Sequence, residues 1–393
     1  MSSDPVVILS ARRTPVGAFQ GVFATVTAPQ LGSVAIKAAI ADSGVAATAI
    51  DEVIMGCVLS AGLGQAPARQ AALGAGVPTG TPTTTVNKMC GSAMRAIMLG
   101  ADQILAGSAE VVVAGGLESM TNAPYLLPKA RAGYRMGHQE VLDHMFFDGL
   151  QSPWDGQLMG CFAEATSGKY DFSRQAQDDF ATESVRRAKA AIADGSFDAE
   201  VTPVSTKTRK GETLVDKDET PNTLDVSKIP SLKPAFKKDG TVTAASSASI
   251  SDGAAAVVLA RESLAKAQGL KPLARILGYT SFATAPEWFT LAPVGAIQKL
   301  LRRLDWRAAD VDLYEVNEAF AVVAMAAMKD LGLDHAQVNV NGGACALGHP
   351  IGATGARILT TLIYALRSRG KKRGIASLCI GGGEATAIAI ELM

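Results

Sequence analysis

The sequence has no run of about 20 apolar residues, the length that a helix needs to cross a bilayer. Apolar runs such as 111–114 and 385–390 have the length of a β-strand. Excess charge of either sign is also missing, since 37 Lys and Arg residues balance 37 Asp and Glu residues. We therefore expect no membrane span, and no global attraction to nucleic acid or to a membrane surface.

Closely spaced cysteine pairs are missing too, although the chain has five cysteines, at positions 57, 90, 161, 345 and 379. An odd number of scattered cysteines argues against both a disulfide framework and a zinc module. Any cysteine function is then expected to be thiol chemistry. The first residues run directly into the strand-like segment 6–9, without the basic region and apolar core of a signal peptide, so we expect a cytoplasmic protein.

What the chain does have is length, apolar residues and glycine. Its 393 residues are 48% hydrophobic and only 19% charged, with 39 glycines, which suits a tightly packed α/β protein of two units. Strand-like runs alternate with helix-like runs in both halves, which favours a tandem duplication of one α/β unit. In the first half we expect strands at 6–9, 52–55, 83–86 and 110–114, with helices at 29–42 and 92–106. In the second half we expect strands at 311–316, 337–340 and 375–380, with helices at 318–330 and 353–368.

The region between the halves breaks this alternation. From about 120 to 245 the sequence is rich in Pro, Gly, Lys and Asp, with two helical segments near 174–194. Residues 207–211 predict a solvated hairpin, and 216–225 predict a loop. Long insertions on a rigid α/β scaffold often serve as lids or binding loops. We therefore divide the chain into an N-terminal half (1–119 with 246–268), an inserted loop domain (120–245) and a C-terminal half (269–393).

Cys90 lies where a predicted strand ends and a predicted helix begins. Apolar residues at 94, 97, 98, 101, 104 and 105 mark one face of that helix. Free amide groups and the dipole at a helix N-terminus stabilise a thiolate, which is the nucleophilic form of cysteine. The alternative is a small buried cysteine with no chemical role, the usual fate of this residue type.

His349 is one of only four histidines and lies in a glycine-rich stretch, 339–355. Glycines let the backbone approach a ligand closely. A histidine there can take a proton from a thiol or donate a hydrogen bond to a developing oxyanion. The alternative is a histidine that caps the following helix.

Two further segments place polar groups at strand ends. Cys379 is followed by three glycines, whose exposed amides can form an anion-binding concavity, although the turn alone could be a tight reversal before the next strand. Asn317 follows the strand predicted at 311–316 and could orient a water or donate to an oxygen. An N-cap role for Asn317 is equally good at this point.

Together these four segments resemble the signature regions of the thiolase family. The matching stretches are VNKMCGSAM (86–94), VNEAFA (316–321), GGACALGHPIGATGAR (342–357) and CIGGGEA (379–385). Their order, their spacing and the chain length also match, and the resemblance runs from Val6 to the C-terminus. Similar segments in ketoacyl synthases lack the second cysteine with its three glycines.

The resemblance implies a thiolase fold of class α/β, in which two similar halves stack as five layers, α-β-α-β-α, and an inserted loop domain covers the active site. By position, Cys90 matches the acyl-carrying nucleophile, and His349 the residue that activates it and helps to bind a thioester oxygen. Cys379 matches the acid/base that acts on the α-proton of the second acyl-CoA. Asn317 matches the residue that holds a water in the first oxyanion hole. The backbone amides of Cys90 and Gly381 match the second hole, which serves the acyl-enzyme.

The resemblance also assigns substrate contacts and shows departures from the family pattern. Leu158 stands where the family usually has a histidine, Ala248 where it has a serine of the pantetheine site, and Phe289 where a methionine is common. Ser247 or Ser249 could replace the missing serine. Basic residues at 207–210 are candidate phosphate contacts, with a solvated hairpin as the alternative. The expected substrate-binding residues are Leu158, Met159, Ser247, Ala248, Ser249, Phe289, Ala319 and Phe320.

The implied activity is the reversible condensation of two acetyl-CoA molecules to acetoacetyl-CoA and CoA, with acyl-CoA and CoA as partners and without a metal or other cofactor. One alternative is a thiolase of fatty-acid breakdown with a broader chain-length range. Another is a non-catalytic acyl-CoA-binding relative, which the presence of Cys90, His349 and Cys379 disfavours. The resemblance also implies a homo-oligomer built on dimers, as a dimer or a dimer of dimers, because the basic stretch 129–135 lies where relatives have a tetramer-forming loop.

Overall fold

The computed structural model describes residues 4–208 and 211–393, and its main feature is a ten-stranded mixed sheet. The strands follow the order β12-β13-β14-β11-β1-β10-β5-β3-β4, and β2 pairs with β10. Their bounds are β1 (Val6–Arg13), β2 (Gly17–Ala18), β3 (Glu52–Gly56), β4 (Thr83–Val86), β5 (Val111–Ser119), β10 (Ser251–Arg261), β11 (Ala274–Ala283), β12 (Leu313–Val316), β13 (Arg373–Ile380) and β14 (Glu384–Leu392).

The sheet consists of two similar halves joined where β1 pairs with β11. In the N-terminal half, β3 runs parallel to β5, and β5 is antiparallel to β10. In the C-terminal half, β12 runs parallel to β13, and β13 is antiparallel to β14. The same pattern of parallel and antiparallel pairs therefore occurs twice, which confirms the predicted duplication.

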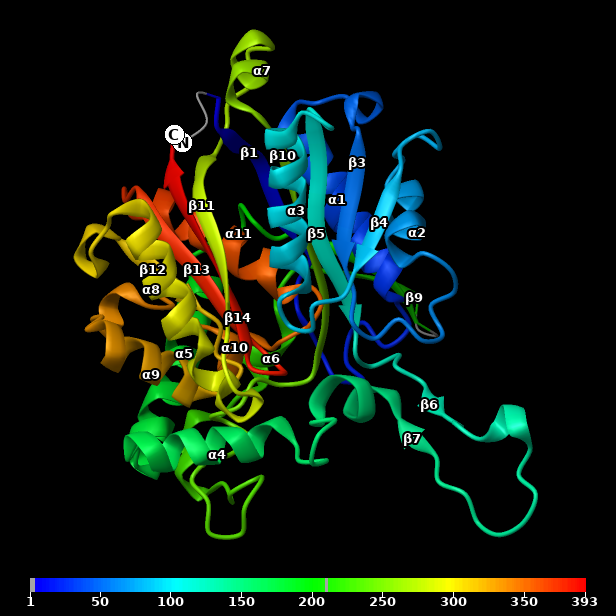
Figure 1. Cartoon of the computed structure of the whole chain (residues 1–393), viewed down its shortest axis with the longest axis vertical. Coiled ribbons are helices and arrows are strands. Elements are labelled where there is room, and N and C mark those ends of the chain that lie inside the picture. The colour runs from blue at the N-terminus through cyan, green and yellow to red at the C-terminus, as the bar shows by residue number, and fades with distance from the viewer. Residues whose placement is uncertain (1–3, 209–210) are drawn as a thin grey trace.

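Helices form three layers around the two half-sheets (Figure 1). Helices α1 (Ala28–Ser43) and α2 (Pro67–Gly74) pack with the N-terminal half-sheet in one hydrophobic cluster, and α8 (Ala292–Leu304) and α9 (Ala321–Leu331) pack with the C-terminal half-sheet in another. Helices α3 (Ser92–Ala106) and α11 (Thr354–Ser368) lie between the half-sheets. Because both of its sides meet protein, α11 is buried continuously from Thr354 to Leu366. The five expected layers are confirmed.

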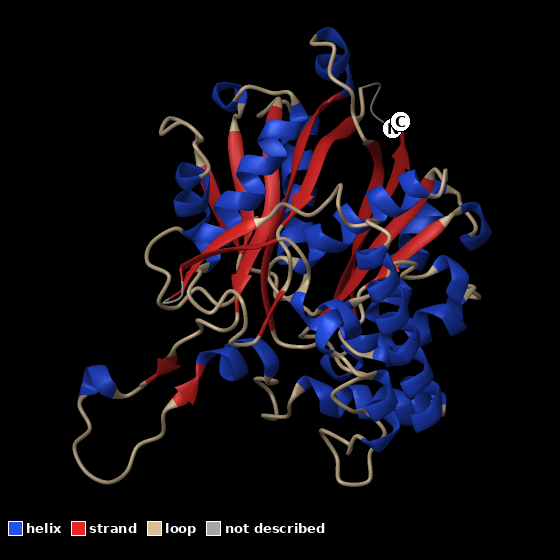
Figure 2. Ribbon diagram, turned by 180° about the vertical axis from the view of Figure 1, so that it is seen from behind, coloured by secondary structure: helices blue, strands red, loops and turns tan. Residues whose placement is uncertain are grey.

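The segment between β5 and β10 holds most of the remaining elements. It contains β6 (Tyr125–Leu126), β7 (Leu142–Asp143), a π-helix (Met145–Leu150), α4 (Met159–Tyr170), α5 (Arg174–Ala193), β8 (Val204–Thr208), β9 (Gly211–Val215) and α6 (Glu219–Thr223). The arm formed by β6, β7 and the loop between them extends away from the body in both views (Figures 1 and 2). Beyond this segment lie α7 (Glu262–Ala267) and α10 (Ala344–Leu347). Within the described ranges, no helix combines the length and apolar character needed to cross a bilayer.

Short 3-10 helices make several of the connections. They span Ala47–Ala49, Ala130–Ala132, Val226–Ser231, Pro286–Leu291, Ala308–Asp310 and His335–Gln337.

Three local predictions were wrong. The strand expected at 337–340 is reduced to a single bridge between Tyr314 and Val338, because Asn339 has a left-handed φ of 49° and uses its side chain to bond the backbone of Val316. The two helical segments expected near 174–194 are one helix, α5. The loop expected at 216–225 contains α6, and Asp218 just before it is buried against Arg13 rather than solvated.

Candidate active site

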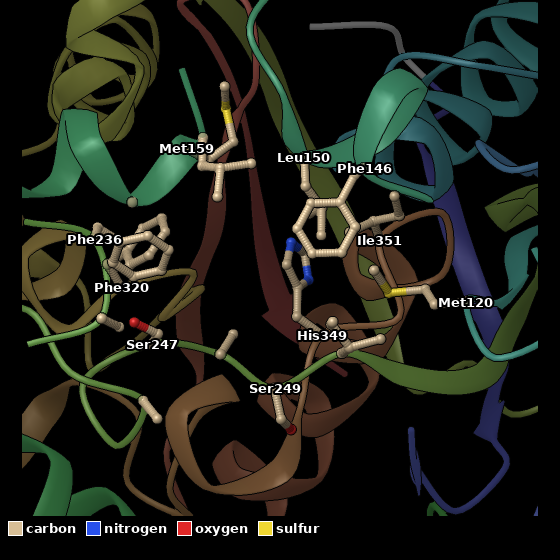
Figure 3. Close-up of a pocket in the computed structure, with 16 residues that line it drawn as sticks. Met120, Phe146, Leu150, Met159, Phe236, Ser247, Ser249, Phe320, His349 and Ile351 are labelled. Atoms are coloured by element: carbon tan, nitrogen blue, oxygen red, sulfur yellow. The ribbon is translucent and has the colours of Figure 1, made fainter. Parts of the chain in front are cut away.

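A largely apolar cavity of about 350 Å³ lies between the inserted segment and the loops that close the two half-sheets. Figure 3 shows the imidazole of His349 projecting into it, with Phe146 and Leu150 on one side and Phe236 and Phe320 across from them. The site residues described below come from the loops at one end of the strands, where ligands of α/β proteins usually bind.

Cys90 lies between β4 and α3, two residues before the first residue of the helix. It packs beside the cluster that contains Met120 and Ile351, which both line the cavity. The preceding Met89 has a left-handed φ of 47°, a conformation that costs energy in a non-glycine residue and is typical of functional turns. The turn therefore holds the sulfur in a definite place beside the cavity.

The cysteine is not a preformed thiolate. Burial of the sulfur raises the pKa of Cys90 to about 11, although hydrogen bonds from the backbone N–H groups of Gly381 and of Cys90 itself pull it down. The expectation that the helix start stabilises a thiolate at rest was therefore incomplete, because desolvation outweighs the backbone donors. The same two N–H groups are the ones that the family pattern assigns to an oxyanion hole.

Cys379 is the penultimate residue of β13, and the three-glycine turn begins after Ile380. Its side chain is fully buried, and burial together with the neighbouring Cys90 raises the pKa of its thiol well above the ordinary value. Gly382 and Gly383 have φ values of 97° and 90°, which other residues rarely adopt, so the turn needs glycine at these positions. The two thiols, from opposite halves of the chain, lie near each other, and both are protonated at neutral pH.

An ion pair joins the two turns that carry these groups. Lys88, two residues before the nucleophile candidate, contacts the carboxylate of Glu384, which opens β14 directly after the glycines. At Gly91 a Cβ atom would lie 2.4 Å from the Cδ1 atom of Ile380. The absence of a side chain at Gly91 therefore permits the close approach of Cys90 to Gly381, and the ion pair links the same two turns.

His349 is buried, and its Nδ1 atom lies 2.7 Å from the Oγ1 atom of Thr354. That hydroxyl also lies 2.9 Å from the carbonyl oxygen of Pro350, to which it can only donate. With its proton used there, Oγ1 accepts from Nδ1–H, so the hydrogen-bond network assigns the proton of neutral His349 to Nδ1. Burial and the charge of Arg357 lower the pKa of His349 to about 3, so the ring is neutral.

The Nε2 atom of His349 is thereby left with a free lone pair and has no hydrogen-bond partner among the described residues. A helix-capping role is excluded, since α11 has Ala353 at its N-cap and no side chain caps it. A buried, unpartnered nitrogen next to the cavity is suited to take a proton from a thiol.

Asn317 directly follows β12, and its backbone N–H donates to Ser377 on β13. Its side-chain Nδ2 atom lies 3.5 Å from Nδ1 of His349, and its Oδ1 atom accepts from Arg357. Because Phe320, not Asn317, is the N-cap of α9, the capping alternative is excluded. Asn317 is instead a buried polar group beside His349.

Glu118, at the end of β5, holds the backbone around the site. Its carboxylate accepts from the N–H groups of Val58, Leu59 and Gly352, and it contacts the thiol of Cys57. Burial raises its pKa to about 7 despite these donors. The carboxylate thus ties the loop after β3 to the loop that follows His349.

Six of the eight expected substrate-binding residues line the cavity: Leu158, Met159, Ser247, Ala248, Ser249 and Phe320. Leu158, which replaces the family histidine, adds an apolar wall. The hydroxyl of Ser247 donates to the Thr243 carbonyl, and the carbonyl of Ser249 accepts from the N–H of His349. Ser249 therefore holds the histidine backbone as well as lining the cavity.

The other two do not line it. Ala319 is buried and accepts a backbone hydrogen bond from Ala248. Phe289 lies behind Phe320, with ring centroids 6.5 Å apart in an edge-to-face arrangement, so its effect on the cavity is indirect. Of the basic residues at 207–210, Lys207 lies on β8 beside a separate hollow, whereas Arg209 and Lys210 fall outside the described residues.

Sequence reasoning missed the rest of the lining. These residues come from the π-helix, from α4, from the loop before β10, and from the segments just after β5 and just before α11. They are Met120, Phe146, Leu150, Gly160, Ala235, Phe236, Ala244, Ile250 and Ile351. Only Ile351 among them lies in one of the four signature stretches.

Comparisons with known proteins identify the family of the chain. The family model of the thiolase N-terminal domain matches residues 6–263, and that of the thiolase C-terminal domain matches 270–392. The acetyl-CoA acetyltransferases of Pseudomonas aeruginosa and Escherichia coli are each 49% identical over 98% of this chain and 98% of their own. Among solved structures, the acetyl-CoA acetyltransferase of Bacillus anthracis superimposes with a TM-score of 0.97 at 43% identity, covering 99% of both chains. The Acat5 thiolase of Ascaris suum in complex with coenzyme A gives 0.94 at 43% identity, covering 99% of this chain and all of that one. The chain belongs to the thiolase family.

Proposed function

We propose that this protein catalyses the reversible condensation of two acetyl-CoA molecules to acetoacetyl-CoA and CoA. The observation that carries the proposal is the placement of two thiols, Cys90 and Cys379, next to each other beside the cavity into which the unprotonated Nε2 of His349 projects. Direct attack of an acetyl carbanion on a thioester would require two large ligands and a strong base at once, and a covalent acyl-thiolate divides that reaction into two easier steps.

In the first step His349 takes the proton of Cys90 through Nε2, and the thiolate attacks the carbonyl carbon of the first acetyl-CoA. The tetrahedral oxyanion accepts hydrogen bonds from the N–H groups of Cys90 and Gly381. The C–S bond to CoA then breaks, CoA leaves with the proton that His349 holds, and an acetyl group remains on Cys90. Backbone donors fixed by the two turns need no reorganisation as the charge develops.

In the second step Cys379 acts as a thiolate and removes an α-proton from the second acetyl-CoA. The enolate oxygen is stabilised by His349 and by the water that the family pattern places on Asn317. The carbanion attacks the acetyl carbon, the new C–C bond forms, and the sulfur of Cys90 leaves. When Cys379 becomes a thiolate it releases a proton, and this proton passes through His349 to Cys90. The two thiols and the imidazole thereby return to their starting states. No metal or prosthetic group takes part in this scheme.

The acetyl preference is supported by the names of the relatives above, all acetyl-CoA acetyltransferases apart from one thiolase, rather than by the apolar wall at Leu158. A direct test is to add CoA to enzyme and acetoacetyl-CoA and to follow the absorbance of the thioester enolate. The proposal predicts loss of this absorbance with stoichiometric formation of acetyl-CoA. An acyl-CoA-binding protein without activity would leave it unchanged.

The arm between β5 and the π-helix supports a homo-oligomer built on dimers. It carries large apolar side chains that are exposed in the single chain, including Tyr125, Leu127, Met136 and Val141, and it extends away from the body (Figure 1). Light scattering at micromolar concentration should give at least twice the chain mass of 40.6 kDa. A mass equal to one chain would contradict the proposal.

We also place the protein in the cytoplasm. Support comes from a relative in Gibberella zeae that is 48% identical over 98% of this chain and is named a cytosolic acetyl-CoA acetyltransferase. Fractionation of cells that express the tagged protein tests this assignment.

A further inference from the structure

Arg357, on α11, is a buried arginine with very few partners. Its side chain is 2% exposed, and within residues 4–208 and 211–393 the guanidinium donates one hydrogen bond, from Nη2 to Oδ1 of Asn317 at 3.5 Å. Its Nη1 atom lies 3.7 Å from the carboxylate of Glu315. Among the same described residues, the atoms Nε and Nη1 of Arg357 have no hydrogen-bond partner.

A buried arginine with so few partners contributes little to the stability of the fold. Removing a charge from water costs several kcal/mol, and the attraction of a partner offsets this only when geometry and hydrogen bonds are good. Arg13, another buried arginine, is well paired, because it bonds both Glu200 and Asp218 at 2.5 to 3.0 Å. The loosely paired Arg357 is therefore better explained by what it does to its neighbours.

The neighbours of Arg357 belong to the site. Thr354, one turn earlier on α11, bonds His349, and Arg357 on the same helix face bonds Asn317. Glu315 lies two residues before Asn317, so both side chains leave the chain on the same side. The first turn of α11 thus contacts both polar residues that serve the first oxyanion hole.

The contact with Arg357 decides which way the Asn317 amide faces. A guanidinium has donors only, so the amide must present Oδ1 to it. The NH₂ group of Asn317 is then directed to the His349 side, where Nδ2 lies 3.5 Å from the ring. Without the arginine the amide could rotate by half a turn and present Oδ1, an acceptor, to the water that is proposed to stabilise the enolate oxygen.

We propose that Arg357, held by Glu315, is a positioning residue that fixes the amide of Asn317 as a donor in the first oxyanion hole. The inference rests on the proposed function. It assigns the positioning role of Arg357 to the enolate-forming half of the reaction, because the second hole is built from backbone groups that Arg357 does not touch. The charge of Arg357 also lowers the pKa of His349, which serves both halves, so the mark of positioning is a loss in enolate formation that clearly exceeds any change in acyl transfer.

The experiment separates the two half-reactions in Arg357→Met. Acyl transfer is followed as exchange of labelled CoA into acetyl-CoA, and enolate formation as uptake of deuterium from D₂O at the α-carbon of acetyl-CoA. Loss of one oxyanion-hole donor costs about 10²–10³ in rate. We therefore expect the rate of deuterium uptake to fall by a factor between about 10 and about 10³. The rate of CoA exchange should change less than about threefold.

A double-mutant cycle with Asn317→Ala distinguishes positioning from general damage. If Arg357 acts through Asn317, the double variant should be within about twofold of Asn317→Ala alone. Arg357→Lys should regain part of the lost deuterium uptake, since an ammonium group can still donate to Oδ1. Should Arg357→Met prove unstable because Glu315 is left unpaired, Glu315→Gln/Arg357→Met replaces both buried ionisable side chains and should show the same selective loss.

Thr361→Val is the matched control. Thr361 lies one turn further along α11, is buried and bonds Glu200, but does not contact Asn317, so both rates should stay within about twofold of the unmodified protein. Equal slowing of both half-reactions in Arg357→Met, or losses that multiply in the double variant, would overturn the inference. Absence of both exchange reactions in the unmodified protein would instead overturn the proposed function.

Discussion

The ionisation of Cys90 can be tested through the pH dependence of its alkylation. Its pKa of about 11 lies about four units above neutral pH, so only about one molecule in 10⁴ carries the thiolate at pH 7. At about 1.36 kcal/mol per unit, ionising the thiol in the free enzyme costs about 5 kcal/mol. With a pKa of about 3, His349 is neutral across the same range and forms no resting ion pair with the thiol.

The assay is iodoacetamide labelling from pH 6 to pH 10, with the Cys90 peptide followed by mass spectrometry. Because the thiolate is the reactive form, its labelling rate should rise about tenfold per pH unit up to pH 10, without a plateau. Conversion of His349 to alanine should leave this slope unchanged, since no proton is shared at rest. A plateau below pH 9 would refute the reasoning, because it would reveal a stabilised thiolate and show that the backbone donors outweigh desolvation.

Three further predictions concern the chemistry and the cavity. Cys379→Ala should still acylate Cys90 from acetyl-CoA but neither condense nor thiolyse, and condensation retained within a few-fold would exclude its acid/base role. His349→Ala should slow both half-reactions by about 10²–10³, measured by the two exchange assays; an effect on only one half would contradict its double role. Leu158→His should change the KM for acetoacetyl-CoA more than the C4 to C8 ratio of kcat/KM, whereas Phe289→Ala, which removes the ring behind Phe320, should shift that ratio toward longer chains. A ratio that already favours C8 in the unmodified protein would contradict the view that the Phe289 ring, through Phe320, restricts the cavity to short acyl chains.

Periodic segments and their ends could be predicted from the sequence. The apolar face of 92–106 and the glycines around Cys379 are local features, so they locate α3 and the turn without knowledge of the fold. The order of strands and helices in both halves also indicates the duplication, because each element carries its own periodicity.

Features that depend on distant partners could not be predicted. Asp218 is buried because Arg13, 205 positions away, bonds its carboxylate, and nothing near residue 218 signals that contact. The strand expected at 337–340 does not form, because the side chain of Asn339 bonds the backbone of Val316 and the backbone pairing of a β-sheet does not continue there. The net rise in the pKa of Cys90 also depends on distant residues, because packing from both halves of the chain removes water from the sulfur.

The reactive residues of the site could be predicted from the sequence, but most of the residues that line the cavity could not. Cys90, His349, Asn317 and Cys379 stand in motifs, whereas Phe146 and Leu150 line the cavity from a π-helix whose sequence gives no sign of it. Phe289 shows the converse, because a residue expected to contact the substrate lies behind another ring.

The most direct test of the two-thiol account is to identify the residue that carries the acyl group. Enzyme mixed with acetyl-CoA is quenched in acid, digested and analysed by mass spectrometry, with Cys90→Ser as the control. The account predicts an acetyl adduct on the peptide that contains Cys90, absent from the control and removed by added CoA. An adduct found only on Cys379, Cys345 or another residue would contradict it.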